Sequence, residues 1–252
     1  MNRTAAALII GNEVLTGKVQ ELNVRVLAKA LFKLGIEFRA CRICPDIEED
    51  IIRDVVALKE SYDFVFTSGG VGPTHDDITL SAVAAAFGRE VVRNEDIAAR
   101  LHEYHGDALT DAHLRMADLP ADAELLRGGK LSWPAIKVDN VFVLPGVPKA
   151  FQWKLETIAM HLRDASAPTF ESLRVYTRSD EALLAPLLDE LDAKYGDVDI
   201  GSYVRWDHPH YKVLITFDGA DKETLELAAS EFREKLPEGQ LVLTELAESI
   251  EE

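Results

Sequence analysis

The chain has 252 residues, of which 47% are hydrophobic, enough for one large or two modest globular domains. The formal net charge of −17 at pH 7 opposes a general role in binding nucleic acid, whose phosphates require a basic surface. The first apolar run, residues 5–10, is too short to span a membrane and lacks a signal-peptide cleavage pattern. We therefore expect a cytoplasmic protein with no membrane partner.

Strands and helices are predicted to alternate through the first two thirds of the chain. The expected strands are residues 5–10, 37–44, 64–67 and 138–144. The expected helices are residues 23–34, 47–61, 79–87, 94–105 and 149–163, with a polar loop around 106–115. Such alternation predicts an α/β domain over residues 1–165, with a mostly parallel sheet covered by helices on both faces.

The composition changes near residues 164–168, which we interpret as a linker. Beyond it the predicted order is strand 173–177, helix 179–195, strands 199–204 and 211–217, helix 221–236 and a short strand near Leu241. That order is the split βαβ pattern of a ferredoxin-like fold, so we expect a small α+β domain over residues 170–247. The acidic tail at 248–252 is expected to fray.

The loop at residues 67–79 is the most informative segment, because it places glycines, hydroxyls and carboxylates between a predicted strand and a predicted helix. Backbone N–H groups at such a turn can surround one anionic oxygen, and glycine allows the close approach that a Cβ would block. The residues expected to bind phosphate here are Ser68, Gly69, Gly70, Gly72 and Thr74.

Two adjacent carboxylates, Asp76 and Asp77, complete this loop. They cannot bind phosphate themselves, because like charges repel, so they indicate a divalent cation that bridges carboxylate and phosphate. The alternative interpretation is a tight strand-to-helix turn in which the aspartates cap the helix.

A second polar turn, residues 11–17, follows the first predicted strand, and Asn23 begins the next helix. In a parallel sheet this turn lies at the same edge as the glycine loop, because both follow strand carboxyl ends. Glu13 can then contact a metal or water, and Asn23 can hydrogen-bond a ligand. Their alternative roles are loop polarity for Glu13 and a helix N-cap for Asn23.

Cysteine and histidine pairs offer rival sites. Cys41 and Cys44, the only cysteines of the chain, lie three apart on a predicted strand and so face opposite sides; we interpret them as unreactive thiols. His208 and His210 lie between two predicted strands and are interpreted as part of an exposed hairpin, since a pair is an incomplete metal site. His75 sits within the glycine loop, where it could contact phosphate or point to solvent.

Residues 11–17, 69–79 and 144–148 carry the motifs GNEVLTG, GGVGPTHDDIT and LPGVP. Together they resemble the signatures of the N-terminal domain of the competence/damage-inducible protein A (CinA) family, within the MoaB/Mog-like molybdopterin-binding superfamily. Further stretches resemble the N-terminal half of eukaryotic FAD synthases, namely residues 115–120, 138–148, 200–203 and 211–213. The resemblance covers nearly the whole chain and implies a MoaB/Mog-like α/β domain followed by the small domain that accompanies it.

The resemblance also implies a chemistry. CinA-type domains resemble metal-dependent pyrophosphatases acting on ADP-ribose, and the FAD synthase half is associated with hydrolysis of FAD to FMN and AMP. Carried across, Asp76 and Asp77 hold a divalent ion (Mg²⁺, Mn²⁺ or Co²⁺, with K⁺ as a further candidate), and Asp77 matches the acidic position of the MoaB/Mog pattern. Asp76 or Glu13 orients the attacking water, while Pro145 and Gly146 form the neighbouring wall of the site.

Two departures from the family pattern keep other functions open. Asn12 stands where the first turn usually carries Asp, and Lys149 and Ala150 replace the acidic residue that often follows the Pro-Gly-Val-Pro motif. The leading hypothesis is a nucleotide pyrophosphatase. The alternatives are pterin binding or adenylyl transfer in molybdenum cofactor biosynthesis, and a non-catalytic nucleotide-binding module. A homo-oligomer is expected, with an isologous dimer as the default.

Overall fold

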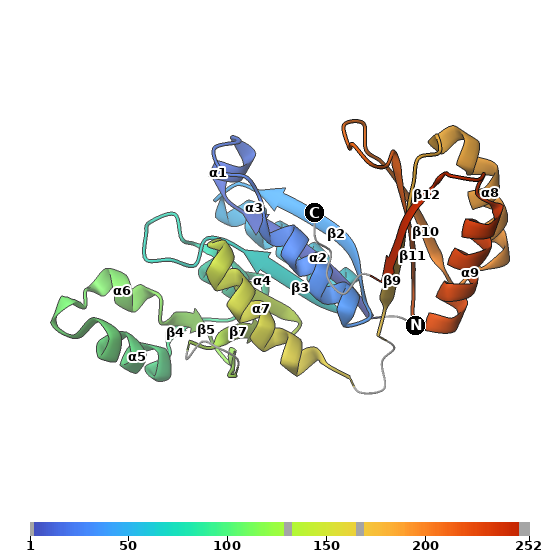
Figure 1. Ribbon diagram of the computed structural model, residues 1–252. Coiled ribbons are helices and arrows are strands. Elements are labelled where there is room, and N and C mark those ends of the chain that lie inside the picture. The colour runs from blue at the N-terminus through green and yellow to red at the C-terminus, as the bar shows by residue number, and fades with distance from the viewer. Residues whose placement is uncertain (1–2, 129–132, 165–168, 247–252) are drawn as a thin grey trace. The chain divides into compact units, whose positions relative to one another are not determined.

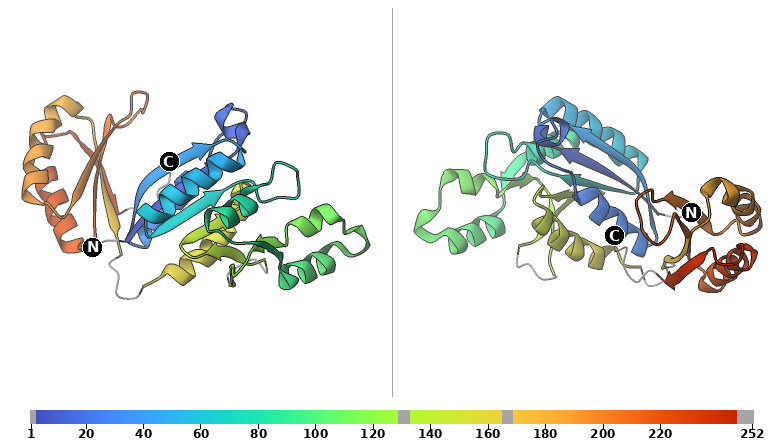
Figure 2. Two further views of the ribbon diagram at one scale, coloured as in Figure 1. Left: turned by 180° about the vertical axis from the view of Figure 1, so that it is seen from behind. Right: turned by 45° about the horizontal axis from the view of Figure 1, so that its top comes forward.

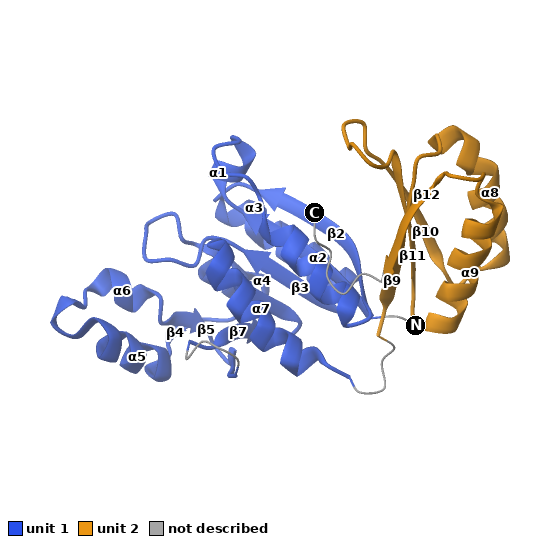
Figure 3. Ribbon diagram, in the orientation of Figure 1, with its two compact units in different colours: residues 1–165 blue, residues 166–252 orange. Residues whose placement is uncertain are grey.

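The computed structural model describes residues 3–128, 133–164 and 169–246 (Figure 1). The chain divides into two compact units, Met1–Ala165 and Ser166–Glu252 (Figure 3). Most of the predicted linker at 164–168 and all of the acidic tail at 248–252 lie outside the described residues. Among the described residues, no helix combines the length and the apolar character that a membrane span requires.

The first unit is built around a six-stranded mixed sheet with the strand order β2-β1-β3-β8-β7-β6. Its strands are β1 (Arg3–Ile10), β2 (Ile36–Cys44), β3 (Phe64–Ser68), β6 (Glu124–Leu126), β7 (Ala135–Val138) and β8 (Val141–Leu144). β1 pairs in parallel with β2 and with β3, and β3 pairs in parallel with β8. The predicted mostly parallel sheet is confirmed, with an antiparallel extension through β7 and β6 at one edge.

The central strand β1 separates two hydrophobic cores. Alternate side chains from Ala6 to Ile10 face one core, and those from Ala5 to Ile9 face the other. Helices cover both faces, which explains why β1 is apolar at every position from Ala5 onward. The helices on one face are α2 (Asn23–Lys33) and α7 (Pro148–Leu162), and those on the other are α3 (Glu48–Ser61) and α4 (Thr79–Ala86) (Figures 1 and 2).

The single strand predicted at 138–144 is wrong: this region ends one hairpin strand and forms the next. β7 and β8 pair antiparallel across a turn at Asp139 and Asn140. Asp139 has a φ of +50°, a left-handed conformation that Asp adopts more readily than most residues with a side chain. Apolar residues continue on both sides of this short turn, so the sequence pattern alone predicts one strand.

An excursion, residues 91–120, leaves the main sheet between α4 and β6. Its base is a two-stranded antiparallel sheet of β4 (Val91–Arg93) and β5 (Asp118–Pro120), and its body contains α5 (Glu95–His105). The loop predicted at 106–115 is partly helical, with a 3₁₀ turn, η1 (Gly106–Ala108), and α6 (Asp111–Arg115). A capping box between Thr110 and His113 begins α6. Because His replaces the usual Glu or Gln of that motif, this helix start is hard to recognise from the residue pattern.

The second unit has a four-stranded antiparallel sheet with the order β10-β11-β9-β12. Its elements are β9 (Glu171–Thr177), α8 (Glu181–Lys194), β10 (Asp199–Val204), β11 (Val213–Gly219), α9 (Lys222–Lys235) and β12 (Leu241–Leu246). Both helices pack on one face of this sheet and share its hydrophobic core. The predicted ferredoxin-like α+β fold is therefore confirmed.

Asn140 ties the β7–β8 turn to the end of α3. Its Nδ2 donates hydrogen bonds of 3.0 Å to the carbonyl oxygens of Lys59 and Tyr62. We predict that Asn140→Ala lowers the free energy of unfolding by about 2 kcal/mol, because two carbonyl groups lose their donor. Urea denaturation measures this change.

The matched control is Asp139→Asn, which keeps a residue that tolerates positive φ. It removes only an exposed ion pair with Arg89, so its stability should stay within about 1 kcal/mol of the wild type. Equal stability of the two variants would contradict the role given to Asn140.

Candidate functional site

A cavity of about 780 Å³ opens where β1, β3 and β8 end. These strands are parallel neighbours, so the loops at their carboxyl ends meet at one edge of the sheet. The volume falls within the range of roughly 300–1,000 Å³ that small-molecule sites occupy. The predicted site residues that line this cavity are Glu13, Gly69, Gly70, Gly72, Asp77, Pro145 and Gly146.

Close packing requires glycine at the start of the loop that follows β3. Gly69 has a φ of +107°, and a Cβ there would lie 2.1 Å from the carbonyl oxygen of Ile10. Gly70 has a φ of +64°, and a Cβ there would lie 2.3 Å from Oγ1 of Thr79. The same Oγ1 donates to the carbonyl oxygen of Gly69 at 2.9 Å. The loop is thus held against the end of β1 by contacts that only glycine permits.

Backbone donors of this loop remain free for a ligand. Within the described chain, the N–H groups of Gly70, Val71 and Gly72 have no protein acceptor. Such groups on a cavity wall can bind an anionic oxygen. The amino-terminal turn of α7 lies on the same cavity through Val147, Pro148 and Ala150, and the positive end of its dipole also favours an anion.

Asp76 and Asp77 converge on the hydroxyl of Thr74. Oγ1 of Thr74 lies 2.6 Å from Oδ1 of Asp76 and 2.5 Å from Oδ2 of Asp77. One hydroxyl proton can serve only one of these carboxylates at a time. The backbone N–H of Thr74 also donates to Oδ2 of Asp77, at 2.8 Å. The hydrogen bond from the Thr74 side chain lowers the pKa of Asp76.

Only one of these two carboxylates faces the cavity. Asp77 lies on its wall, whereas the side chain of Asp76 is 59% exposed to solvent. The described residues contain no group of three or more His, Cys, Asp or Glu side chains that could hold a metal by themselves. A Mg²⁺-type ion needs no such group when substrate phosphates and water supply the remaining ligands. The carboxylate of Asp77, beside the free N–H groups on the cavity wall, fits that kind of site, and Asp76 meets Asp77 at the Thr74 hydroxyl from the solvent side.

Asn23 lies behind the cavity, and its side chain connects the loops. It is 4% exposed, and its Nδ2 donates to Oγ of Ser68 at 2.9 Å and to the carbonyl oxygen of Gly146 at 2.8 Å. This geometry gives Asn23 a positioning role. It is the first residue of α2, whose N-cap is Leu22, so it is not the N-cap of that helix. Ser68 is likewise buried beneath the loops, and Thr74 acts through the two aspartates.

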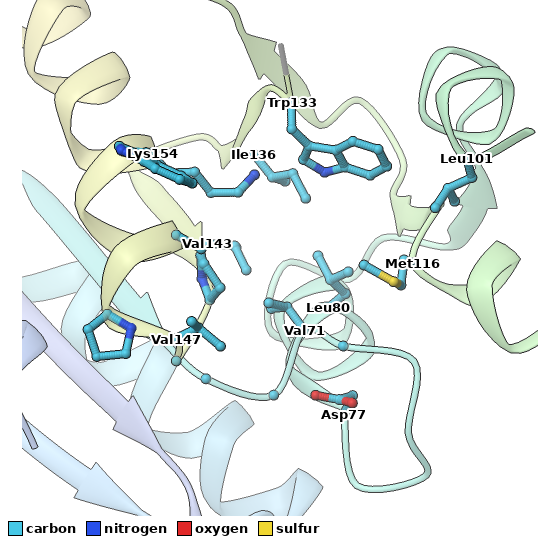
Figure 4. Close-up of a pocket in the computed structure, with 18 of the residues that line it drawn as sticks. Val71, Asp77, Leu80, Leu101, Met116, Trp133, Ile136, Val143, Val147 and Lys154 are labelled. Atoms are coloured by element: carbon cyan, nitrogen blue, oxygen red, sulfur yellow. The ribbon is translucent and has the colours of Figure 1, made fainter. Parts of the chain in front are cut away.

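Sequence reasoning missed the far side of the cavity, which carries apolar side chains and one lysine (Figure 4). Its main apolar residues are Val71, Leu80, Leu101, Met116, Trp133, Ile136, Val143 and Val147. Lys154 extends from α7 into this wall, and its Nζ donates to the carbonyl oxygen of Pro134. Burial lowers the pKa of Lys154 to about 8. The sequence offered one indication that Lys154 faces inward: it lies three residues after Phe151 and four before Ile158, both buried on the same side of the helix.

The residues of the rival constellations are absent from the described lining of this cavity. The side chain of His75 is 96% exposed, so it points to solvent. His208 and His210 are exposed in the β10–β11 loop, where His208 packs on Tyr211. Cys41 is exposed and Cys44 is buried, and burial raises the pKa of the Cys44 thiol to about 12. That thiol is therefore protonated and unreactive at neutral pH.

Comparison with known proteins identifies the family. Residues 6–164 match the family described as a probable molybdopterin binding domain. The chain belongs to this family. Residues 169–245 match the family described as the middle domain of FAD synthase. The resemblance drawn from the three motifs is thereby confirmed.

Individual relatives agree with this assignment. A probable FAD synthase of Caenorhabditis elegans is 34% identical, with the match covering 93% of this chain and 50% of that protein. Protein PF0476 of Pyrococcus furiosus is 32% identical and covers 91% of this chain and 98% of its own. A crystal structure of the protein CinA with unknown function from Thermoplasma acidophilum has a TM-score of 0.59 at 28% identity, covering 64% of this chain and 98% of its own. The chain thus spans about half the length of the nematode relative.

The Asn23 hydrogen bonds predict a measurable loss of stability. We expect Asn23→Ala to lower the free energy of unfolding by about 2 kcal/mol, because the hydroxyl of Ser68 and the carbonyl of Gly146 lose a buried donor. Asn12→Ala makes the same substitution at an exposed position of α1 (Asn12–Leu15) and should change stability by less than about 0.5 kcal/mol. Thermal unfolding of both variants tests this difference, and an Asn23→Ala protein as stable as the control would refute it.

Replacement of Lys154 is predicted to raise the free energy of unfolding, whereas Asn23→Ala lowers it, and the size of the gain should depend on pH. A pKa lowered from 10.5 to about 8 costs the folded state about 3 kcal/mol below pH 8, and this cost disappears as the pH rises through 10.5. We therefore predict that Lys154→Met raises the free energy of unfolding at pH 7 by up to about 3 kcal/mol, and that the gain shrinks between pH 8 and 10.5. Urea titrations at pH 7 and pH 10 measure it.

Lys149→Met is the matched control, since Lys149 is an exposed lysine on the same helix. It should give no comparable gain at either pH. A loss of stability in Lys154→Met at pH 7, or a gain independent of pH, would contradict the assigned burial cost.

Proposed function

We propose that the chain is a metal-dependent nucleotide pyrophosphatase, which hydrolyses a dinucleotide-type diphosphate such as FAD or ADP-ribose to AMP plus FMN or ribose 5-phosphate. The main support is that free N–H groups of the glycine loop and the carboxylate of Asp77 line the same cavity. Free donors suit phosphate oxygens, whereas a carboxylate beside them suits a cation that those oxygens share. The match to FAD synthase relatives supports a nucleotide as the substrate.

The chain's own groups position the diphosphate. The N–H groups of Gly70, Val71 and Gly72 would bind its oxygen atoms. The backbone N–H of Thr74 donates to Oδ2 of Asp77 and orients this carboxylate, while the Thr74 hydroxyl proton serves either Asp76 or Asp77. Oδ1 of Asp77 has no described protein partner. Arg115 donates to the carbonyl oxygen of Pro73 at 2.9 Å and fixes the outer part of the loop. Preset donors of this kind bind the reacting phosphates without rearrangement.

Asp77 and Asp76 would hold the divalent ion, Mg²⁺, Mn²⁺ or Co²⁺, with K⁺ as a further counter-ion. When bound, that ion supplies positive charge that stabilises the negative charge developing on the phosphates. The reaction balances as hydrolysis: a water oxygen bonds to one phosphorus, the bridging P–O bond breaks, and the water loses a proton. Glu13 lines the cavity whereas Asp76 faces solvent, so Glu13 is the better-placed carboxylate to orient that water and accept its proton.

Two other candidate functions have specific support. The family description as a probable molybdopterin binding domain favours a pterin ligand, for which the same free N–H groups would bind the phosphate. Asn12 favours a non-catalytic nucleotide-binding module, because the first turn has an amide where the family usually has a carboxylate. The backbone N–H of Asn12 donates to Oδ2 of Asp46 at 2.8 Å. Adenylylation of molybdopterin would support the first, and tight nucleotide binding without turnover would support the second.

The deciding experiment is incubation of the purified chain with FAD, ADP-ribose or NAD. Each substrate is combined with Mg²⁺, Mn²⁺ or Co²⁺, with and without K⁺, and products are resolved by mass. Release of AMP together with FMN or ribose 5-phosphate supports the pyrophosphatase and names its substrate. Absence of AMP under every metal would reject it.

We predict that Asp77→Asn lowers kcat/KM for AMP release by about 100-fold or more, because it removes the cavity's carboxylate charge while keeping its shape. Asp122→Asn is the control, since Asp122 lies outside the cavity lining and its φ of +61° is one that Asn tolerates. Circular dichroism should show that both variants are folded. Wild-type turnover by Asp77→Asn would exclude the metal-binding role of this residue.

Assembly and location complete the proposal. We propose an isologous homodimer, for which light scattering of the purified chain is the direct test. A cytoplasmic location is also proposed, and cell fractionation tests it.

A further inference from the structure

Lys154 is a half-buried cation in a wall that is mostly apolar. Its side chain runs from α7 toward Ile136, on the side of the cavity away from Asp77 (Figure 4). No charged group contributes to its altered titration, for which burial is the cause, so no described carboxylate neutralises it. Its one described hydrogen bond is to the carbonyl oxygen of Pro134.

A half-buried lysine with no neutralising carboxylate is unusual in a chain with 44 acidic and 27 basic residues. By contrast, Lys137 of the described chain contacts Glu124, Lys194 contacts Glu231, and Lys235 contacts both Glu190 and Glu231. A charge that destabilises the folded state and lies on a cavity wall indicates a functional role. The ammonium has three protons and Pro134 accepts one, so two remain for an acceptor within the cavity.

The wall around Lys154 suits a flat ring. Trp133, Ile136 and Met116 offer broad apolar surfaces, and the indole of Trp133 can stack on an aromatic system. The two polar side chains labelled at this end in Figure 4, Lys154 and Trp133, can only donate hydrogen bonds. A ring edge that carries carbonyl oxygens satisfies these donors.

We propose that Lys154 is a specificity-determining residue, whose ammonium donates to a carbonyl oxygen of a fused heteroaromatic ring seated against Trp133, such as the dione ring of a flavin. The inference rests on the proposed function, because it assigns one half of the dinucleotide to this end of the cavity. It favours FAD over ADP-ribose, since the terminal ribose of ADP-ribose has neither a flat ring nor a ring carbonyl.

Binding of riboflavin, FMN and AMP to the full chain tests this role without requiring turnover. Riboflavin isolates the ring because it has no phosphate, and AMP carries a phosphate with adenine. Flavin fluorescence reports the first two, and calorimetry reports AMP. The proteins are the wild type, Lys154→Met, Lys154→Arg and the control Lys149→Met, which removes an exposed lysine of the same helix.

The expected result is a loss of about tenfold or more in riboflavin and FMN affinity for Lys154→Met, because a hydrogen bond from a charged donor is lost. AMP affinity should be unchanged, Lys149→Met should behave as wild type, and Lys154→Arg should recover part of the flavin affinity. Equal losses for AMP and the flavins, or no loss for either flavin, would overturn the proposal. Failure of the wild type to bind riboflavin and FMN would also overturn it.

Failure of this inference is distinguishable from failure of the proposed function. A chain that binds FMN through Lys154 but releases no AMP from any substrate refutes only the pyrophosphatase. If the wild type releases AMP from ADP-ribose, and Lys154→Met binds flavins as tightly as the wild type does, only the role of Lys154 is refuted.

Discussion

The contact between Gly69 and the carbonyl oxygen of Ile10 is the constraint on which the site depends. It brings the loop after β3 against the end of β1, at a distance that leaves no room for a side chain. Asn23 then links the end of β3 to the loop after β8 through Ser68 and Gly146. Three loops that are far apart in sequence therefore form one rigid edge, and the free N–H groups of the glycine loop are presented from a fixed backbone.

A second feature is the separation of charge within the cavity. Carboxylates and free N–H groups lie at the edge formed by the strand ends, whereas Lys154 lies alone in the apolar wall. Each charge is costly in the absence of a partner, because the cavity removes part of the water that would screen it. A ligand with phosphates at one end and a polar aromatic ring at the other would neutralise both.

Much of the fold, and the position of the site within it, can be predicted from the sequence. The alternation of strands and helices predicts the parallel core, and parallel strands place residues 11–17 and the glycine loop at one edge. The order of elements after residue 170 predicts the ferredoxin-like fold. The β7–β8 turn and α6 were missed because they depend on a positive φ at Asp139 and on an unusual cap at His113. Lys154 and Trp133 were missed because cavity walls are defined by packing between distant segments, which periodicity does not encode.

The excursion, residues 91–120, has a consequence for how substrate preference can evolve. It contributes Leu101, Tyr104, His105 and Met116 to the cavity. Its strands β4 and β5 pair only with each other, outside the main sheet, and it packs on the first unit through buried side chains such as Ile97 and Leu101. Insertions or substitutions there can reshape the ring-binding end while Gly69, Asn23 and the strand ends keep their geometry. Under the proposed function, variation in this segment would change which compound the cavity selects, while the loops that would hold its phosphates keep their backbone.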